Sequence, residues 1–102
     1  MAVQTKGGFP VTIRPTFATS GTAAAVKRVA PARTIHLRIR NTDVTNALRI
    51  YWTEADYTAA NTNYLLISPN TIFSEPAEIV AFWPLAETAP IVAEVTYFAR
   101  RA

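Results

Sequence analysis

The feature that most constrains the fold of this chain is a series of short stretches in which apolar and polar residues alternate, with turn residues between them. The clearest case spans residues 34–40, where Ile35, Leu37 and Ile39 alternate with polar side chains. Comparable stretches recur roughly every eight to twelve residues, which is typical of an all-β sandwich or barrel. Because no segment shows a sustained helical period, the pattern predicts an all-β fold. We expect an antiparallel β-sandwich or jelly-roll-like small barrel of about six to eight strands.

The length of the chain, 102 residues, suits one domain. We expect residues 1–20 to form an extended N-terminal arm and residues 21–102 to form a single β-sandwich domain. Pro10 and Pro15 disfavour a central strand within the arm, because each proline removes a hydrogen-bond donor from the ladder. Residues 9–17 are therefore expected either as an edge strand or as part of the arm.

The remaining elements are assigned from the same alternation. Residues 48–53 follow a turn rich in asparagine and aspartate, so they are predicted to form a hairpin with residues 35–40. Residues 54–63 are expected to form a polar loop, and residues 23–29 fit a short helical turn and an extended segment equally well. Further strands are expected at residues 64–68, 71–76, 78–83 and 91–99, with Pro84 ending the third of them.

Three pairs of neighbouring aromatic residues lie within these predicted strands, namely Tyr51–Trp52, Phe82–Trp83 and Tyr97–Phe98. Because side chains alternate along a strand, each pair places one ring on each sheet face. One ring can enter the core, and the other needs a second cover, since an aromatic side chain buries about 150–250 Å² and large apolar patches are unusual on monomers. The expected cover is a partner surface, such as the N-terminal arm of a neighbouring copy. The alternative is that the chain's own first thirty residues fold back over that face.

Charge is distributed unevenly along the chain. Residues 1–49 hold eight basic and one acidic side chain, whereas residues 50–102 hold two basic and six acidic ones, which gives a net charge of +3. Such a chain can associate head to tail with copies of itself. Alternatively, the folded chain distributes the basic side chains of the first half and the acidic side chains of the second half over one common surface.

Catalytic chemistry has little support in the sequence. There is no cysteine, and His36, the only histidine, lies on the polar side of a predicted strand without a recognisable orienting partner. Glycine-rich phosphate-binding motifs are missing. We therefore expect no enzyme activity, no cofactor and no small-molecule substrate, and no apolar run approaches the length that would predict a membrane partner.

Metal binding is not expected either, although one loop leaves the question open. Glu54 and Asp56 precede Asn61 and Asn63, and oxygen-rich loops can hold calcium. The spacing and glycine of an EF-hand are lacking. A solvated loop without metal is the favoured interpretation.

The basic residues of the first half suggest two kinds of partner. With Tyr51 and Tyr64 near enough to stack on bases, they could bind single-stranded nucleic acid, as small β-barrels do. The acidic second half and the lack of an aromatic RNA-binding motif disfavour that partner. Contact between Arg38, Arg40 or Arg49 and an acidic protein surface is favoured instead.

Residues 35–99 resemble small virion proteins of tailed bacteriophages. The likeness is carried by an alternating strand that ends in asparagine, by the segments "ALRIYW" and "YLLISPN", and by the closing "VAEVTYF" strand. The resemblance implies a compact β-sandwich or jelly-roll subunit without catalytic residues. Such subunits serve as capsid decoration (cement) proteins, or less often in the head–tail connector or the tail. Few glycines and a basic first half set this chain apart from the pattern.

We therefore expect a non-enzymatic structural protein of the virion, made in the host cytoplasm, that forms a homo-oligomer and binds a major capsid protein. A small carbohydrate- or single-stranded-nucleic-acid-binding β-module is the alternative. The oligomer number and any exchange of the arm between subunits stay open. The residues expected at interfaces are Val11, Ile13, Phe17, Arg38, Arg40, Arg49, Tyr51, Phe82 and Phe98.

Overall fold

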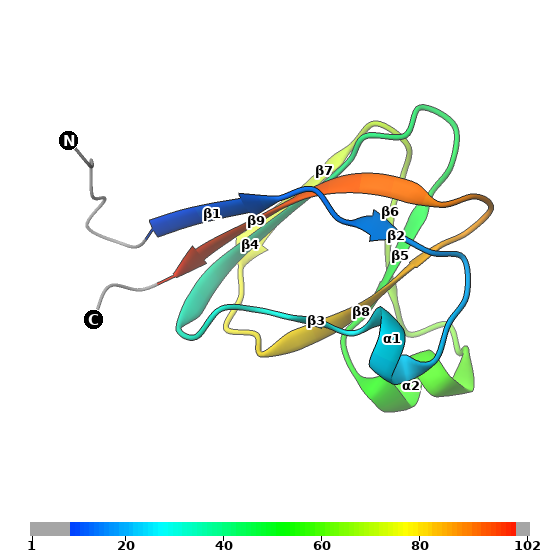
Figure 1. Cartoon of the computed structure of the whole chain (residues 1–102), viewed down its shortest axis with the longest axis horizontal. Coiled ribbons are helices and arrows are strands. Elements are labelled where there is room, and N and C mark those ends of the chain that lie inside the picture. Colours follow the sequence, from blue (N-terminus) through cyan, green and yellow to red (C-terminus); the bar gives the residue numbers. More distant parts are fainter. Residues whose placement is uncertain (1–8, 100–102) are drawn as a thin grey trace.

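Two antiparallel sheets face each other in the computed structural model, which describes residues 9–99 (Figure 1). The first sheet has the strand order β1-β9-β4-β7, and β2 also pairs with β9. Its strands are β1 (Phe9–Ile13), β2 (Thr16–Phe17), β4 (Thr34–Asn41), β7 (Ile72–Pro76) and β9 (Ile91–Ala99). The second sheet has the order β3-β8-β5-β6. Its strands are β3 (Arg28–Val29), β5 (Leu48–Tyr51), β6 (Leu65–Ile67) and β8 (Ala81–Ala86). Within the described residues the helices are α1 (Ala23–Val26) and α2 (Glu54–Ala59).

The strand order is that of a jelly roll. Because β1 and β2 both pair with β9, they act as one strand interrupted at Arg14 and Pro15. Counted in this way, eight strands form two four-stranded sheets, and the chain passes from sheet to sheet at every step except between β5 and β6. The predicted all-β sandwich fold is confirmed.

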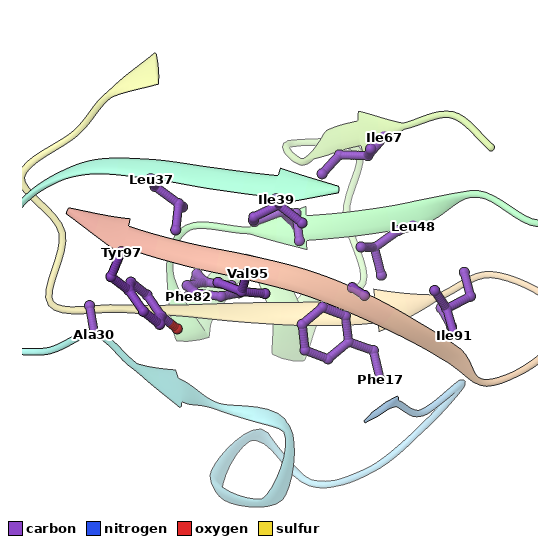
Figure 2. Close-up of a cluster of buried hydrophobic side chains, with 13 residues drawn as sticks. Phe17, Ala30, Leu37, Ile39, Leu48, Ile67, Phe82, Ile91, Val95 and Tyr97 are labelled. Atoms are coloured by element: carbon purple, nitrogen blue, oxygen red, sulfur yellow. The ribbon is translucent and has the colours of Figure 1, made fainter. Parts of the chain in front are cut away.

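The main core lies between the two sheets (Figure 2). Leu37 and Ile39 of β4 and Val95 of β9 are fully buried there, because they share the inward side of their strands. Phe82 enters from the opposite sheet. Each such side chain stabilises the fold by roughly 1.5–3 kcal/mol through removal of apolar surface from water.

The predicted hairpin between residues 35–40 and 48–53 is wrong. Strand β4 pairs with β7 and β9, whereas β5 pairs with β6 and β8 in the other sheet. The turn after β4 is held instead by Asn41, which is fully buried and whose Nδ2 donates to the backbone oxygens of Asn46, Ile67 and Ser68. These hydrogen bonds connect the turn after β4 to the end of β6, which belongs to the second sheet. They therefore fix the turn where the chain crosses from the first sheet to the second.

The predicted polar loop at residues 54–63 is also wrong in its first half, where α2 forms. Thr53 caps the helix, since its Oγ1 accepts a hydrogen bond from the backbone N–H of Asp56. Glu54 and Asp56 lie in the first turn, where negative charge is favourable, and Ala60 ends the helix in the left-handed conformation. Residues 23–29 combine both expected forms, because α1 is followed directly by β3.

Strand β8 continues past Pro84, which was expected to end it. Beyond Phe82 the strand has a paired neighbour on one side only, because β3 pairs with Ala81 and Phe82 alone. A sheet tolerates proline at such an edge position, where the missing N–H is not needed by the ladder.

Residues 9–17 form the edge of the first sheet rather than a separate arm. Strands β1 and β2 pair with β9 along its length, and Phe17 is only 2% exposed within the main core. The boundary predicted at residue 20 is therefore too late for these residues, and residues 1–8 lie outside the described part of the chain. Neither helix within residues 9–99 has the length and apolarity that a membrane span requires.

Candidate interaction surface

The outer side of the second sheet is covered along β5 and β8 by the chain itself, whereas Leu66 of β6 is 48% exposed. A second cluster contains Val26 of α1 with Tyr51 and Trp83, and Tyr57 and Tyr64 pack against it. The Tyr57 hydroxyl donates to the backbone oxygen of Gly21 at 2.6 Å, which ties α2 to the segment before α1. Burial also raises the pKa of Tyr57. The helices therefore act as a lid on this sheet.

This lid corrects the expectation for the pairs Tyr51–Trp52 and Phe82–Trp83, whereas in the third pair Tyr97 enters the main core and Phe98 is only partly buried. Phe82 lies in the main core and Trp83, which is 8% exposed, lies under the lid, so both rings of this pair are buried within one chain. Tyr51 is buried beside Trp83. The expectation that Phe17, Tyr51 and Phe82 contact another molecule is therefore wrong for this conformation, because their side chains lie inside the chain's own two clusters. The alternative cover, from the first thirty residues, holds in part, since α2 supplies the rest.

Within residues 9–99 the outer side of the first sheet has no such lid, because α1 and α2 both pack on the second sheet. Strands β4 and β9 turn Leu37, Ile39, Val95 and Tyr97 inward, so the residues between them point outward. We call this the outer face. Its polar and aromatic members are Thr12, Arg14, His36, Arg38, Arg40, Ser74, Glu94, Thr96 and Phe98, and the exposed Pro10 and Ile72 lie on the same side.

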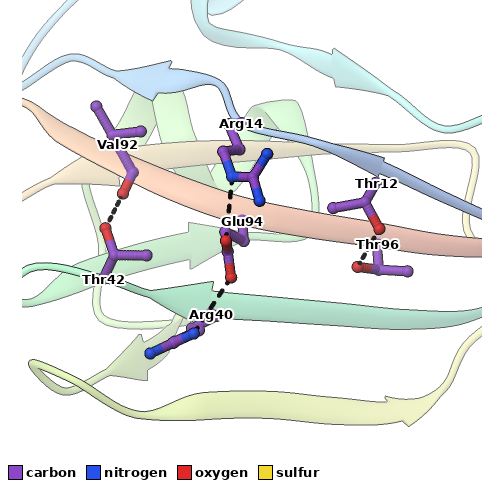
Figure 3. A network of polar contacts seen from close by, with 7 residues as sticks. All are labelled: Thr12, Arg14, Arg40, Thr42, Val92, Glu94 and Thr96. Carbon is purple, nitrogen blue, oxygen red and sulfur yellow. Dashed lines mark hydrogen bonds and ion pairs between the residues drawn. The ribbon is translucent and has the colours of Figure 1, made fainter.

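Glu94 lies at the centre of a polar network on the outer face (Figure 3). Its Oε2 is 3.1 Å from Arg14 Nε, and its Oε1 is 3.4 Å from Arg40 Nη1. Thr12 and Thr96 are joined by a hydrogen bond of 3.0 Å between their hydroxyl oxygens. Exposed ion pairs of this kind contribute only about 0–1 kcal/mol to stability, so the network mainly orders side chains from three neighbouring strands.

A second group on the outer face surrounds His36. Its Nε2 is 2.8 Å from Ser74 Oγ, and its ring meets Phe98 edge-on with 5.2 Å between the ring centroids. Arg38, on the next outward position of β4, is exposed and forms no ion pair within residues 9–99. The outer face therefore carries three arginines against one glutamate, with one arginine not engaged by a carboxylate of the described chain.

The predicted interface residues separate into distinct places. Arg38, Arg40 and Phe98 share the outer face. Arg49 lies on the second sheet, where its Nε is 2.6 Å from Glu87 Oε2 and its guanidinium carbon is 4.6 Å from the centre of the Tyr64 ring. The hydrogen bond to Glu87 raises the pKa of Arg49. The sequence did not indicate this separation. Arg40 and Arg49 are close along the chain and were expected in one hairpin, but their strands belong to different sheets.

Val11 and Ile13 lie at another edge. Both occupy the inward side of β1, opposite Tyr97 and Val95, yet they are 44% and 39% exposed. The facing edge strand β3 has only two residues, so it does not cover them. They therefore lie at the margin of the core.

The basic residues considered for nucleic-acid binding do not share one face. Arg28 points into the sandwich margin, where its guanidinium carbon is 5.5 Å from the centre of the Phe17 ring. Tyr51 is buried and unavailable for stacking on a base. The described structure therefore lacks the continuous basic and aromatic track that single-stranded nucleic acid requires.

The segment considered for calcium is organised by hydrogen bonds within the protein. The Asp56 carboxylate accepts from Asn61 Nδ2 and from Asn63 Nδ2, each at 2.8 Å. These bonds, led by that of Asn61, lower the pKa of Asp56. Among residues 9–99, no three histidine, aspartate or glutamate side chains lie close enough together to hold a metal ion.

Sequence reasoning missed Arg14, Glu94 and the paired threonines of the outer face. Their proximity depends on the register between β1, β9 and β4. Alternation places each residue on a side of its strand, but it does not identify the neighbouring strand. Comparison with family models, with curated proteins and with solved structures finds no match for this chain.

Proposed function

We propose that this chain is a non-enzymatic structural protein of a tailed-phage virion, and that it decorates the capsid by docking its outer face on an acidic surface of the major capsid protein. The observation that carries the proposal is the contrast between the two sheets. The second sheet is covered along β5 and β8 by α1 and α2, whereas within residues 9–99 no helix packs on the outer face of the first sheet, which has an excess of arginine.

The chemistry of the outer face suits an acidic protein surface. Arginine presents a planar set of donors that matches a carboxylate, and Arg38 has no carboxylate partner within residues 9–99. Phe98, Thr12 and Thr96 add an aromatic ring and hydroxyl groups to the same face. Many weak contacts of this type become strong when several copies bind one lattice, which fits a homo-oligomer.

The fold is compatible with this role, as an analogy only. Jelly rolls occur in viral capsid proteins and also in lectins, and a fold by itself does not define a function. The virion assignment depends on the resemblance of residues 35–99 to small phage virion proteins. A place in the head–tail connector or the tail is the alternative within the same class.

The first experiment is mass spectrometry of purified virions from the phage that encodes the chain. We expect the protein in intact particles, at a copy number that is a simple fraction of the major capsid protein. Its absence from the particle would overturn the proposal, and a copy number typical of a connector or tail would move it to those sites.

The second experiment tests the surface. Particles that lack the protein are incubated with the purified chain or with its Arg38→Glu variant, and occupancy is measured after sedimentation. Charge reversal within a docking surface brings like charges together, so binding should fall at least roughly tenfold. Arg33→Glu is the matched control, because Arg33 is also exposed but lies in the turn before β4. Equal loss in both variants, or in neither, would contradict docking through the outer face.

A further inference from the structure

A groove opens where the two sheets part at the β6–β7 margin, and none of the residues named for the outer face lines it. Its volume is about 700 Å³, within the range of small-molecule sites. The apolar part of its lining comes from both sheets and from the segment before β8. It includes Trp52, Leu65, Phe73, Ile79 and Trp83.

The groove exists because facing strands differ in length. Strand β6 has three residues and β7 has five, so the last residues of β7 have no strand opposite them. Glu75 pairs with the fully buried Leu37 and so lies on the inward side of β7, yet it is exposed. Trp52 follows the end of β5 and packs against Phe73, with 6.0 Å between the ring centroids.

Charged groups lie around this apolar lining. Glu75 and Glu78 contribute two carboxylates, and Lys27 contributes an ammonium group whose Nζ is 5.7 Å from the centre of the Trp83 ring. None of these three forms an ion pair within residues 9–99. Acceptors and a donor are therefore available to a ligand beside the aromatic rings.

We propose that this groove binds a neutral saccharide. The C–H face of a sugar ring is apolar and can pack on Trp52 and Phe73, while its hydroxyl groups donate to Glu75 and Glu78 and accept from Lys27. A wholly apolar ligand would bury these charges without partners, which is unfavourable. The two carboxylates repel a phosphate backbone. A neutral polyol satisfies both signs of charge.

The test uses the full chain labelled with ¹⁵N, titrated separately with maltotriose, cellotriose and tri-N-acetylchitotriose, after a screen on an array of bacterial and eukaryotic glycans. We expect at least one neutral glycan to shift the indole N–H resonances of Trp52 and Trp83. Trp52→Ala should weaken that binding at least roughly tenfold. Glu75→Gln and Glu78→Gln should weaken it as well, and they keep the fold intact because both side chains are exposed.

Glu54→Gln is the matched control, because Glu54 is an exposed carboxylate in α2 that does not line the groove. Tetralysine and an oligothymidylate are titrated in parallel. The inference is overturned if no glycan on the array or among the three trisaccharides binds, if only tetralysine or the oligothymidylate shifts the Trp52 resonance, or if Glu54→Gln weakens binding as much as the groove variants do. Because the outer face is not involved, these outcomes are independent of capsid docking.

Discussion

Phe82 and Trp83 are neighbours in β8, and both are buried although they point to opposite sides of the strand. Phe82 lies between the two sheets, and Trp83 lies beneath α1 and α2. A chain of this size therefore encloses two apolar clusters, one on each side of β8. The second cluster covers the rings on this side of β8 without a partner, whereas no helix within residues 9–99 packs on the outer face of the first sheet.

Truncating either ring should destabilise the isolated protein to a similar extent. Phe82→Ala and Trp83→Ala are each expected to lower the free energy of unfolding by about 3–5 kcal/mol, because each leaves a cavity among packed side chains. Urea unfolding followed by circular dichroism measures this. A Trp83→Ala variant as stable as the parent chain would show that α1 and α2 do not enclose the ring in solution.

The N-terminal strands offer a matched comparison between buried and marginal positions. Phe17→Ala should cost about 3–5 kcal/mol, because Phe17 is 2% exposed in the main core. Val11→Ala should cost less than about 1 kcal/mol, because nearly half of that side chain is already in water. Thermal unfolding of the two variants separates an integral edge from a detachable arm. If Phe17→Ala proved as mild as Val11→Ala, residues 9–17 would be a loosely attached segment.

Much of the local structure was predictable from the sequence. Alternation identified β4 and β9, and the exposed arginines of β4 lie on the polar side as expected. The pairing of strands was not predictable, because alternation encodes the side of a strand and not its neighbour. The lid was missed for another reason: α2 has only six residues, too few for a helical period, and its signal was the cap Thr53 followed three positions later by Asp56.

The candidate interaction surface, like the fold, was predictable only in part. Arg38 and Arg40 follow from the parity of β4, so their common face was expected. The contribution of Arg14 and Glu94 required the register of β9 with its two neighbours. The groove could not be foreseen either, since it results from the unequal lengths of β6 and β7, which pair with different strands.

Asn41 is expected to be a determinant of the turn that links the sheets. Its Nδ2 donates to three backbone oxygens, and its Oδ1 accepts from the backbone N–H of Asp43. Asn41→Ala leaves these buried groups without a partner and should lower the free energy of unfolding by about 2–4 kcal/mol, as measured by urea unfolding. Unchanged stability would mean that the turn is fixed by its other contacts.

Asn41→Asp tests the burial of the same side chain by replacing its amide with a carboxylate. The introduced carboxylate would face three carbonyl oxygens in a buried position, so burial and repulsion should raise its pKa above the value in the unfolded chain. A raised pKa gives the variant greater relative stability as the pH falls. Stability curves of the variant and the parent, measured between neutral and mildly acidic pH, should therefore converge toward acid. Parallel curves would contradict a buried environment for this side chain.

The Asp56 carboxylate gives a pH-dependent contribution to the turn that follows α2, because it accepts hydrogen bonds from Asn61 and Asn63. Its pKa is lowered mainly by the hydrogen bond from Asn61, with help from Thr53 and Asn63. Because the pKa is lower in the folded state than in the unfolded one, the stabilisation is present above the unfolded value and is lost as the pH falls through the folded value. Asn61→Ala should raise the pKa of Asp56, which a carboxyl ¹³C titration by NMR measures directly.

Asp43 is the internal control in the same spectra, because its pKa is lowered by the backbone N–H groups of Asn46 and Thr45 and should not change. If the pKa values of both aspartates changed, the variant would have a generally loosened fold. If neither pKa changed, the hydrogen bond from Asn61 would not be the cause of the lowered pKa of Asp56.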